Sequence, residues 1–221
     1  MLKNWMFGSV KIYQKINWQS YANTFPSKYI NYTKSDESIE KTINMLPNGS
    51  ALDVGGGVSG TEYLKEWAVD YYLLDPYVCS SERQTSWLEV KGRKFDIILA
   101  RGSFNYLSIT EITTLLECIG ERGAFFFNTF LTPKTGSRRY DSASGQGVES
   151  FEFVSGKPFG KIIHTLAPDD TDILIRHEFY YYPPEFLESI FKEHKIKWSL
   201  TKTNNTGLYM CRHLRSVNSS T

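Results

Sequence analysis

The sequence predicts an α/β fold, with a doubly wound, mostly parallel sheet that ends on a C-terminal antiparallel strand. Three observations predict it. From about residue 35, short apolar runs alternate with amphipathic stretches of helical period. A glycine-rich turn at residues 55–60 follows the first apolar run. The last two apolar runs are separated only by Asn204-Asn205, which suits a turn between antiparallel strands.

The expected elements alternate along the chain as in a sheet with right-handed crossover helices. The first helix begins at the capping residues of SDESIEKTINML, carries Ile39, Ile43 and Leu46 at helical spacing, and ends at Pro47. The sequence then predicts a strand at 51–55, a helix at 61–67, strands at 70–76 and 95–102, a helix at 108–122, strands at 123–130 and 172–182, a helix at 183–195, and strands at 196–203 and 207–214.

Three segments lie outside this alternation. Residues 1–34 are rich in aromatic side chains without a clean period, and we expect an N-terminal helical lid of short helices and loops. Residues 131–170 interrupt the core domain, 35–215, with β-like pieces around a KPFG turn, so we expect an inserted cap or hairpin. Residues 216–221 are polar and predict a disordered tail.

Composition narrows the class of protein. Apolar residues make up 41% and charged residues 22% of the 221 residues, which is typical of a globular domain. The formal net charge of +1 disfavours a nucleic-acid partner, and no apolar run has the length of a membrane span. Three widely spaced cysteines, of which Cys118 and Cys211 fit an apolar core, indicate a reducing, cytoplasmic location. The first residues lack the apolar run of a signal peptide.

The segment ALDVGGGVSG has the chemistry of a nucleoside-binding turn. Gly55, Gly56 and Gly57 follow a strand and precede a helix, so the backbone there can turn tightly and approach a ligand closely. Asp75 ends the next strand, where a carboxylate can accept hydrogen bonds from both ribose hydroxyls of an adenosine. The strand before the turn, the helix after it and the acid in register together predict a cofactor site.

Two kinds of cofactor fit this turn. GGGVSG satisfies the G-x-G-x-x-G pattern, so an NAD(P)-dependent oxidoreductase is one reading. Asp53 argues against it, because a carboxylate two residues before Gly55 repels a pyrophosphate but suits a ligand with an ammonium group. The late start of the strand and the absence of a Tyr-x-x-x-Lys pair also disfavour hydride transfer. These features favour S-adenosyl-L-methionine.

The motifs DVGGGVSG, LLDPY, FDIILARGSFNYL and IGERGAFFFNTF resemble those of class I, Rossmann-like S-adenosylmethionine-dependent methyltransferases, and the later HEFYYYPPEFLESIFKEHKIK resembles their small-molecule branch. The resemblance covers about residues 35–214. It implies a methyltransferase acting on a small-molecule acceptor at oxygen, nitrogen or carbon. A non-catalytic S-adenosylmethionine-binding protein is the other alternative that keeps this fold.

The resemblance also implies roles for individual residues. Asp53 and the glycines of the turn would hold the methionine end, Asp75 the ribose, and Pro76 and Tyr77 would lie beside the adenine. Phe95 follows Asp75 by only twenty positions, where the family usually fits a helix and a further strand with an adenine contact. In this shortened stretch, Trp87 and Leu88 would take the place of that contact. Ala100 and Arg101 would lie under the sulfonium and the amino-acid part, and Arg101 could bind a carboxylate or serve only as a surface residue or salt-bridge partner.

The sequence assigns no catalytic residue, because methyl transfer from an activated sulfonium needs alignment and desolvation more than a particular base. His164 in the inserted segment and His177 and Tyr181 on the strand 172–182 are the candidates. No His-Glu-x-x-His motif or Cys/His cluster predicts a metal, and the phosphate-loop and esterase-elbow motifs do not occur. RGSFNYL also differs from the Asn/Asp-Pro-Pro-aromatic motif of amino-methylating DNA enzymes.

Overall fold

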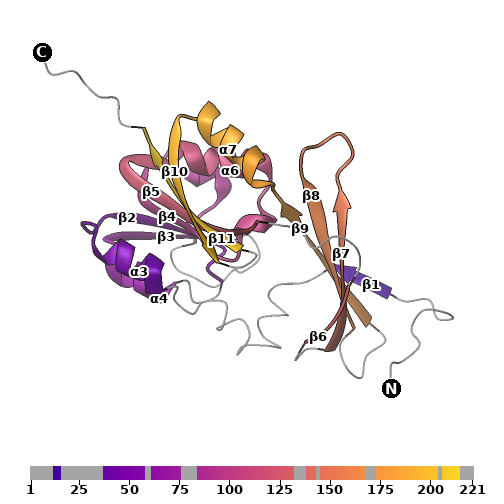
Figure 1. Ribbon diagram of the computed structural model, residues 1–221. Coiled ribbons are helices and arrows are strands. Elements are labelled where there is room, and N and C mark those ends of the chain that lie inside the picture. The colour runs from indigo at the N-terminus through magenta and orange to yellow at the C-terminus, as the bar shows by residue number, and fades with distance from the viewer. Residues whose placement is uncertain are drawn as a thin grey trace, which may run out of the picture.

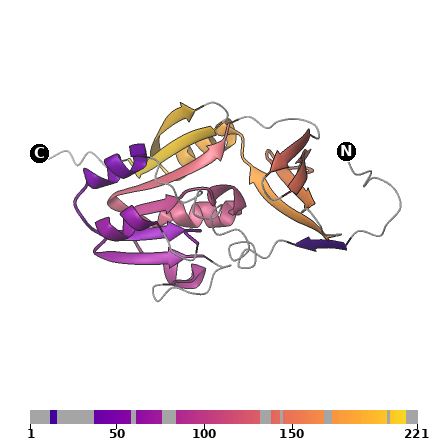
Figure 2. The same ribbon diagram turned by 90° about the horizontal axis from the view of Figure 1, so that it is seen from below.

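A computed structural model gives the fold of the chain and describes residues 12–15, 37–57, 61–75, 84–131, 138–142, 145–167, 173–203 and 206–214. These residues form two sheets, which lie side by side in Figures 1 and 2. The larger sheet has six strands in the order β10-β11-β5-β4-β2-β3, and the smaller has five in the order β1-β9-β8-β7-β6.

The six-stranded sheet is the core of the fold. Its parallel strands β3, β2, β4 and β5 are joined at one side by the antiparallel strand β11, which β10 follows as the outer neighbour. The bounds are β2 Ser50–Val54, β3 Asp70–Leu74, β4 Phe95–Ala100, β5 Ile119–Phe130, β10 Ile196–Thr203 and β11 Thr206–His213. This arrangement confirms the predicted fold class, including the antiparallel strand at the C-terminal end.

Helices cover both faces of the core sheet. One apolar cluster packs α3 (Glu37–Asn44) and α4 (Glu62–Trp67) on one face. A second cluster packs α5 (Trp87–Val90), the 3₁₀ helix η1 (Phe104–Tyr106), α6 (Ile109–Glu117) and α7 (Pro184–Glu193) on the other. Figure 1 shows α3 and α4 on the opposite side of the sheet from α6 and α7. The sheet is therefore doubly wound.

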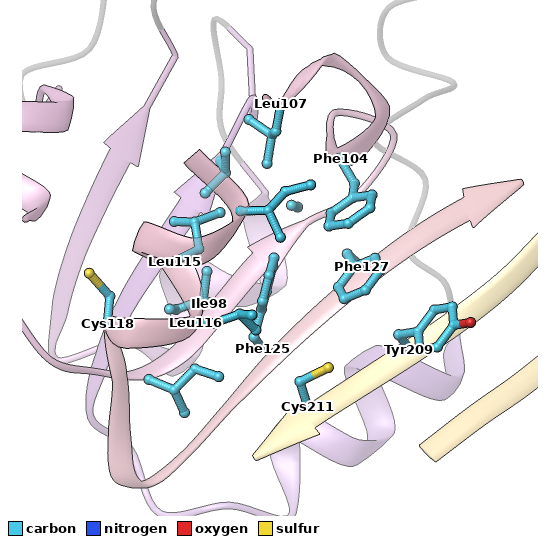
Figure 3. Packing of buried hydrophobic residues seen from close by; sticks show 14 of the residues in the cluster. Ile98, Phe104, Leu107, Leu115, Leu116, Cys118, Phe125, Phe127, Tyr209 and Cys211 are labelled. Atoms are coloured by element: carbon cyan, nitrogen blue, oxygen red, sulfur yellow. The ribbon is translucent and has the colours of Figure 1, made fainter. Parts of the chain in front are cut away.

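The aromatic run in β5 explains why this strand is apolar on both faces. Phe125 and Phe127 point into the cluster of α6 and α7, whereas Phe126 belongs to the cluster of α3 and α4. Figure 3 shows Phe127 between Phe104 and Tyr209. The ring centroids of Phe104 and Phe127 are 3.8 Å apart, and those of Phe127 and Tyr209 are 5.1 Å apart. Cys118 and Cys211 are buried in the same cluster, as the sequence predicts.

The five-stranded cap sheet contains the inserted segment. Its strands are β1 Ile12–Lys15, β6 Arg138–Ser142, β7 Gly145–Phe153, β8 Gly160–Ala167 and β9 Ile173–Tyr181. β6 to β9 form antiparallel pairs, and β1 pairs in parallel with β9. β9 runs from the cap to the start of α7, and so connects the two sheets (Figure 1).

Two expectations need correction. The strand predicted at 172–182 does not resume the core sheet, because β9 forms a ladder with β8 from Gly160 to Leu166. The helix predicted at 108–122 ends at Glu117, because Ile119 is already the first residue of β5 and pairs with Phe95 of β4. A Cβ atom at Gly120 or Gly123 would collide with the Phe95 carbonyl, so glycine allows the two strands to approach there.

The described part of the N-terminal segment is a strand, β1, whereas helices and loops are expected. The remainder of 1–34 and the expected tail 216–221 lie outside the described residues. In the described ranges, no helix is both long and apolar enough to cross a membrane.

Candidate functional site

The glycine turn joins the carboxyl end of β2 to α4. Gly55 and Gly57 have φ angles of 71° and 72°, in the left-handed region that favours glycine. The Gly55 N–H donates to the Leu74 carbonyl at 2.8 Å, which ties the turn to the end of β3. A Cβ atom at Gly55 would collide with the Ser103 side chain, and one at Gly56 with the Asp53 carboxylate. The turn therefore depends on glycine at each of these positions.

Asp53 lies beneath the turn, inside the protein. Its carboxylate is 2% exposed, and Oδ2 accepts hydrogen bonds from the Thr61 N–H and the Tyr71 hydroxyl, both at 2.7 Å. Burial raises the pKa of Asp53, while the bonds from Tyr71 and Thr61 oppose this rise. Burial and the nearby Asp53 charge also raise the pKa of Tyr71, which keeps its hydroxyl a donor. Asp53 thus fixes the start of α4 and the neighbouring strand β3 around the turn.

Asp75 lies directly after β3 and faces the same turn. It is 4% exposed, and its Oδ2 accepts a hydrogen bond from the Gly57 N–H at 3.0 Å. The structure therefore brings together Asp53, the glycine turn and Asp75, which the sequence places at the ends of adjacent parallel strands. Two buried carboxylates beside a glycine turn form a polar site at the carboxyl edge of the sheet, where α/β folds bind ligands.

The end of β4 borders the turn as well. Ala100 is buried, and the Ser103 hydroxyl donates to the Val54 carbonyl, so residues 101–103 lie against the last residue of β2. Among the described residues, the buried Nη1 of Arg101 has no hydrogen-bond partner. Because a buried N–H without an acceptor is costly, this guanidinium is a candidate for binding a carboxylate ligand.

The shortened stretch after Asp75 is only partly described. Pro76 and Tyr77 lie outside the described residues. The described residues of this stretch form one parallel bridge between Leu73 and Gln84, followed by α5 with a capping box. On α5, Trp87 packs against the core cluster, whereas Leu88 is 84% exposed. A contact of Pro76, Tyr77, Trp87 or Leu88 with adenine stays a prediction.

The three catalytic candidates lie on the cap side. Register places His164 of β8 opposite His177 of β9, and the side chains of both lie outside what the structure describes. The Tyr181 hydroxyl donates to the Leu131 carbonyl at 3.1 Å, and burial, with the Glu185 charge, raises its pKa. The Tyr181 hydroxyl is thus engaged within the protein, and a catalytic role for His164, His177 or Tyr181 stays a prediction. No three His, Cys, Asp or Glu side chains gather into a metal site within the described part of the chain.

Three residues of the site were not predicted from the sequence. Thr61 and Tyr71 donate to Asp53, and Ser103 donates to Val54. Thr61 directly follows the last glycine of the motif, which is the signal that could have singled it out. Tyr71 and Ser103 come from other elements, so nothing in the sequence spacing points to them.

Solved structures share this architecture. Streptomyces venezuelae DesVI matches with a TM-score of 0.59 and 15% identity over 91% of this chain and all of the other (100%). An S-adenosylmethionine-dependent methyltransferase from Clostridium acetobutylicum matches with a TM-score of 0.58 and 16% identity over 89% and 98% of the two chains. The sugar N-methyltransferase KedS8 from Streptoalloteichus matches with a TM-score of 0.58 and 12% identity over 95% and 98%.

The chain has the fold of the S-adenosylmethionine-dependent methyltransferases. The resemblance drawn from the sequence motifs is thus confirmed at the level of the fold. No family model and no curated protein matches the sequence. In this methyltransferase fold, the glycine turn and Asp75 lie at the carboxyl ends of β2 and β3.

Removal of the Tyr71 hydroxyl tests the structural role of Asp53. We expect Tyr71→Phe to lower the free energy of unfolding by about 2 kcal/mol, because a buried carboxylate loses a charge-assisted hydrogen bond. Chemical denaturation measures this difference. Tyr72→Phe on the same strand is the control and should change stability by less than about 0.5 kcal/mol. Equal losses in the two variants would contradict the structural role given to the Tyr71–Asp53 bond.

Proposed function

We propose that the chain is an S-adenosylmethionine-dependent methyltransferase that acts on a small organic acceptor in the cytoplasm. The observation that carries the proposal is the buried acidic pair, Asp53 and Asp75, beside a glycine turn in which Gly55 and Gly57 have left-handed φ angles. The methyltransferase fold of the neighbours supports it, and so does the name of KedS8 as a sugar N-methyltransferase.

The residues present fit this cofactor. Asp75 would accept hydrogen bonds from the ribose hydroxyls, because a buried carboxylate at the end of the second strand is an acceptor for a diol. The backbone of Gly55 to Gly57 would lie against the methionine part, and Asp53 below it would supply negative charge toward the ammonium group. The buried N–H of Arg101 would donate to the carboxylate of the same amino-acid part. When bound, S-adenosylmethionine supplies a methyl group already activated on a sulfonium.

The protein's own contribution is then alignment and exclusion of water. Ala100 ends β4 beneath the amino-acid part in this proposal, and the aromatic junction of the two sheets faces the acceptor side. That junction contains Tyr106, Phe130 and Phe179. The ring centroid of Phe179 lies 5.7 Å from that of Tyr106 and 5.6 Å from that of Phe130. Proton removal from the acceptor is not assigned to a residue, since Tyr181 is held by Leu131.

Asp75 is the first residue to test. We expect Asp75→Ala to weaken binding of S-adenosylhomocysteine by about 10- to 100-fold, because one or two hydrogen bonds to a charged acceptor are lost. Isothermal titration calorimetry measures the affinity, and thermal unfolding checks that the variant is folded. The matched control is Asp70→Ala, which removes an exposed carboxylate at the other end of β3. Unchanged affinity in Asp75→Ala, or an equal loss in Asp70→Ala, would contradict the proposal.

Arg101 can be tested with two thioethers that differ only in the amino-acid part. We expect Arg101→Gln to weaken S-adenosylhomocysteine about tenfold, because a charge-assisted hydrogen bond to the carboxylate is lost. Binding of methylthioadenosine, which lacks that carboxylate, should change by less than about twofold. The same calorimetric titration measures both. An equal loss of affinity for both ligands would contradict a contact between Arg101 and the carboxylate.

A further inference from the structure

Residues 103–107, which include η1, contact the glycine turn at one end and the root of the cap sheet at the other. At the first end, the Ser103 hydroxyl donates to the carbonyl of Val54, the last residue of β2. The Ser103 side chain also occupies the space that the missing Cβ of Gly55 leaves. A change in the backbone of the turn therefore meets Ser103 directly.

The middle of this segment is fixed to the core by Phe104. Its side chain is fully buried, and its ring stacks on Phe127 at 3.8 Å with an interplanar angle of 11°. The same ring meets the edge of Tyr182 at 6.1 Å. Figure 3 shows Phe104 and Leu107 at the same end of the packed cluster. Because close packing resists small independent shifts, we expect residues 103–107 to respond as a unit.

The other end of the segment holds β9. Asn105 is 7% exposed, and its Nδ2 donates to the Tyr180 carbonyl at 2.8 Å and to the Thr129 hydroxyl at 3.0 Å. The Tyr182 hydroxyl donates to the Leu107 carbonyl at 2.6 Å. The amide of Asn105 is therefore shared between the end of β5 and the strand that carries the cap.

We propose that Asn105 is a positioning residue that couples the cofactor turn to the cap sheet. The coupling rests on the proposed function. A cofactor at the glycine turn restrains Ser103, the restraint passes through the packed η1, and the Asn105 amide transmits it to Tyr180 on β9. The cap is then ordered over the acceptor side only after the cofactor is bound. Such coupling requires one element that contacts both the turn and the cap, and residues 103–107 make both contacts.

Hydrogen–deuterium exchange of the full chain, with and without saturating S-adenosylhomocysteine, tests the coupling. In the unmodified protein, we expect the ligand to slow amide exchange in the glycine turn and, by about fivefold or more, in the paired stretch of β8 and β9. Asn105→Asp keeps the size of the side chain but cannot donate to Tyr180. We expect this variant to keep protection of the turn and an affinity within about threefold, and to lose the response of β8 and β9.

Two further variants separate coupling from a merely structural effect. Ser103→Ala removes the bond to Val54 at the opposite end and leaves the Asn105 bonds in place, so it should also abolish the response of β8 and β9. If Asn105→Asp does not fold, Ser103→Ala alone tests the coupling. Asn128→Asp is the matched control on β5, since Asn128 precedes Thr129 and its Oδ1 has no partner among the described residues. It should keep the response.

Three results of the exchange experiment would overturn the coupling, and one of them would also overturn the proposed function. Protection of the turn without any response of β8 and β9 in the unmodified protein would overturn the coupling and leave the proposed function intact. A response that survives in both Asn105→Asp and Ser103→Ala would overturn it as well. A lack of ligand protection at the turn itself would overturn the proposed function and the coupling with it.

Discussion

The buried carboxylate of Asp53 holds three parts of the site together: the end of β2, the start of α4 and strand β3. A carboxylate inside a protein is costly unless its oxygens accept strong hydrogen bonds, and here Thr61 and Tyr71 supply them. The bond to Thr61 sets where α4 begins after the glycines. The bond to Tyr71 fixes β3 beside β2, so that Asp75 emerges next to Gly57. The geometry of the turn therefore depends on Asp53 even though its bonded oxygen faces the protein interior.

This constraint changes how the acid in the motif is understood. The sequence alone suggests that Asp53 meets the ammonium group of a ligand. The structure shows its Oδ2 bonded within the protein, so Asp53 shapes the turn, and a contact between Asp53 and a ligand stays a proposal. We propose that Asp75 and Arg101 are the side chains that meet a ligand. Asp75 borders the turn through Gly57, and Arg101 has a buried N–H without a partner among the described residues.

Much of the core could be predicted from the sequence because its signals are local. Apolar runs such as FDIILA and GAFFFNTF predict strands covered on both faces, and glycine after the strand at 51–55 predicts the turn. The site contacts of Tyr71, Ser103 and Asn105 could not be predicted, because each joins elements that are distant in sequence. The prediction that the strand at 172–182 belongs to the core sheet failed for the same reason. Its alternation fits either sheet, and only its long-range pairing with β8 decides between them.

We propose that the glycine turn binds S-adenosylmethionine and not a dinucleotide. Calorimetric titration of the unmodified protein with S-adenosylhomocysteine and, separately, with NADH tests it most directly. We expect saturable binding of S-adenosylhomocysteine with one ligand per chain and no measurable heat from NADH binding. Tight binding of NADH with no response to S-adenosylhomocysteine would contradict it.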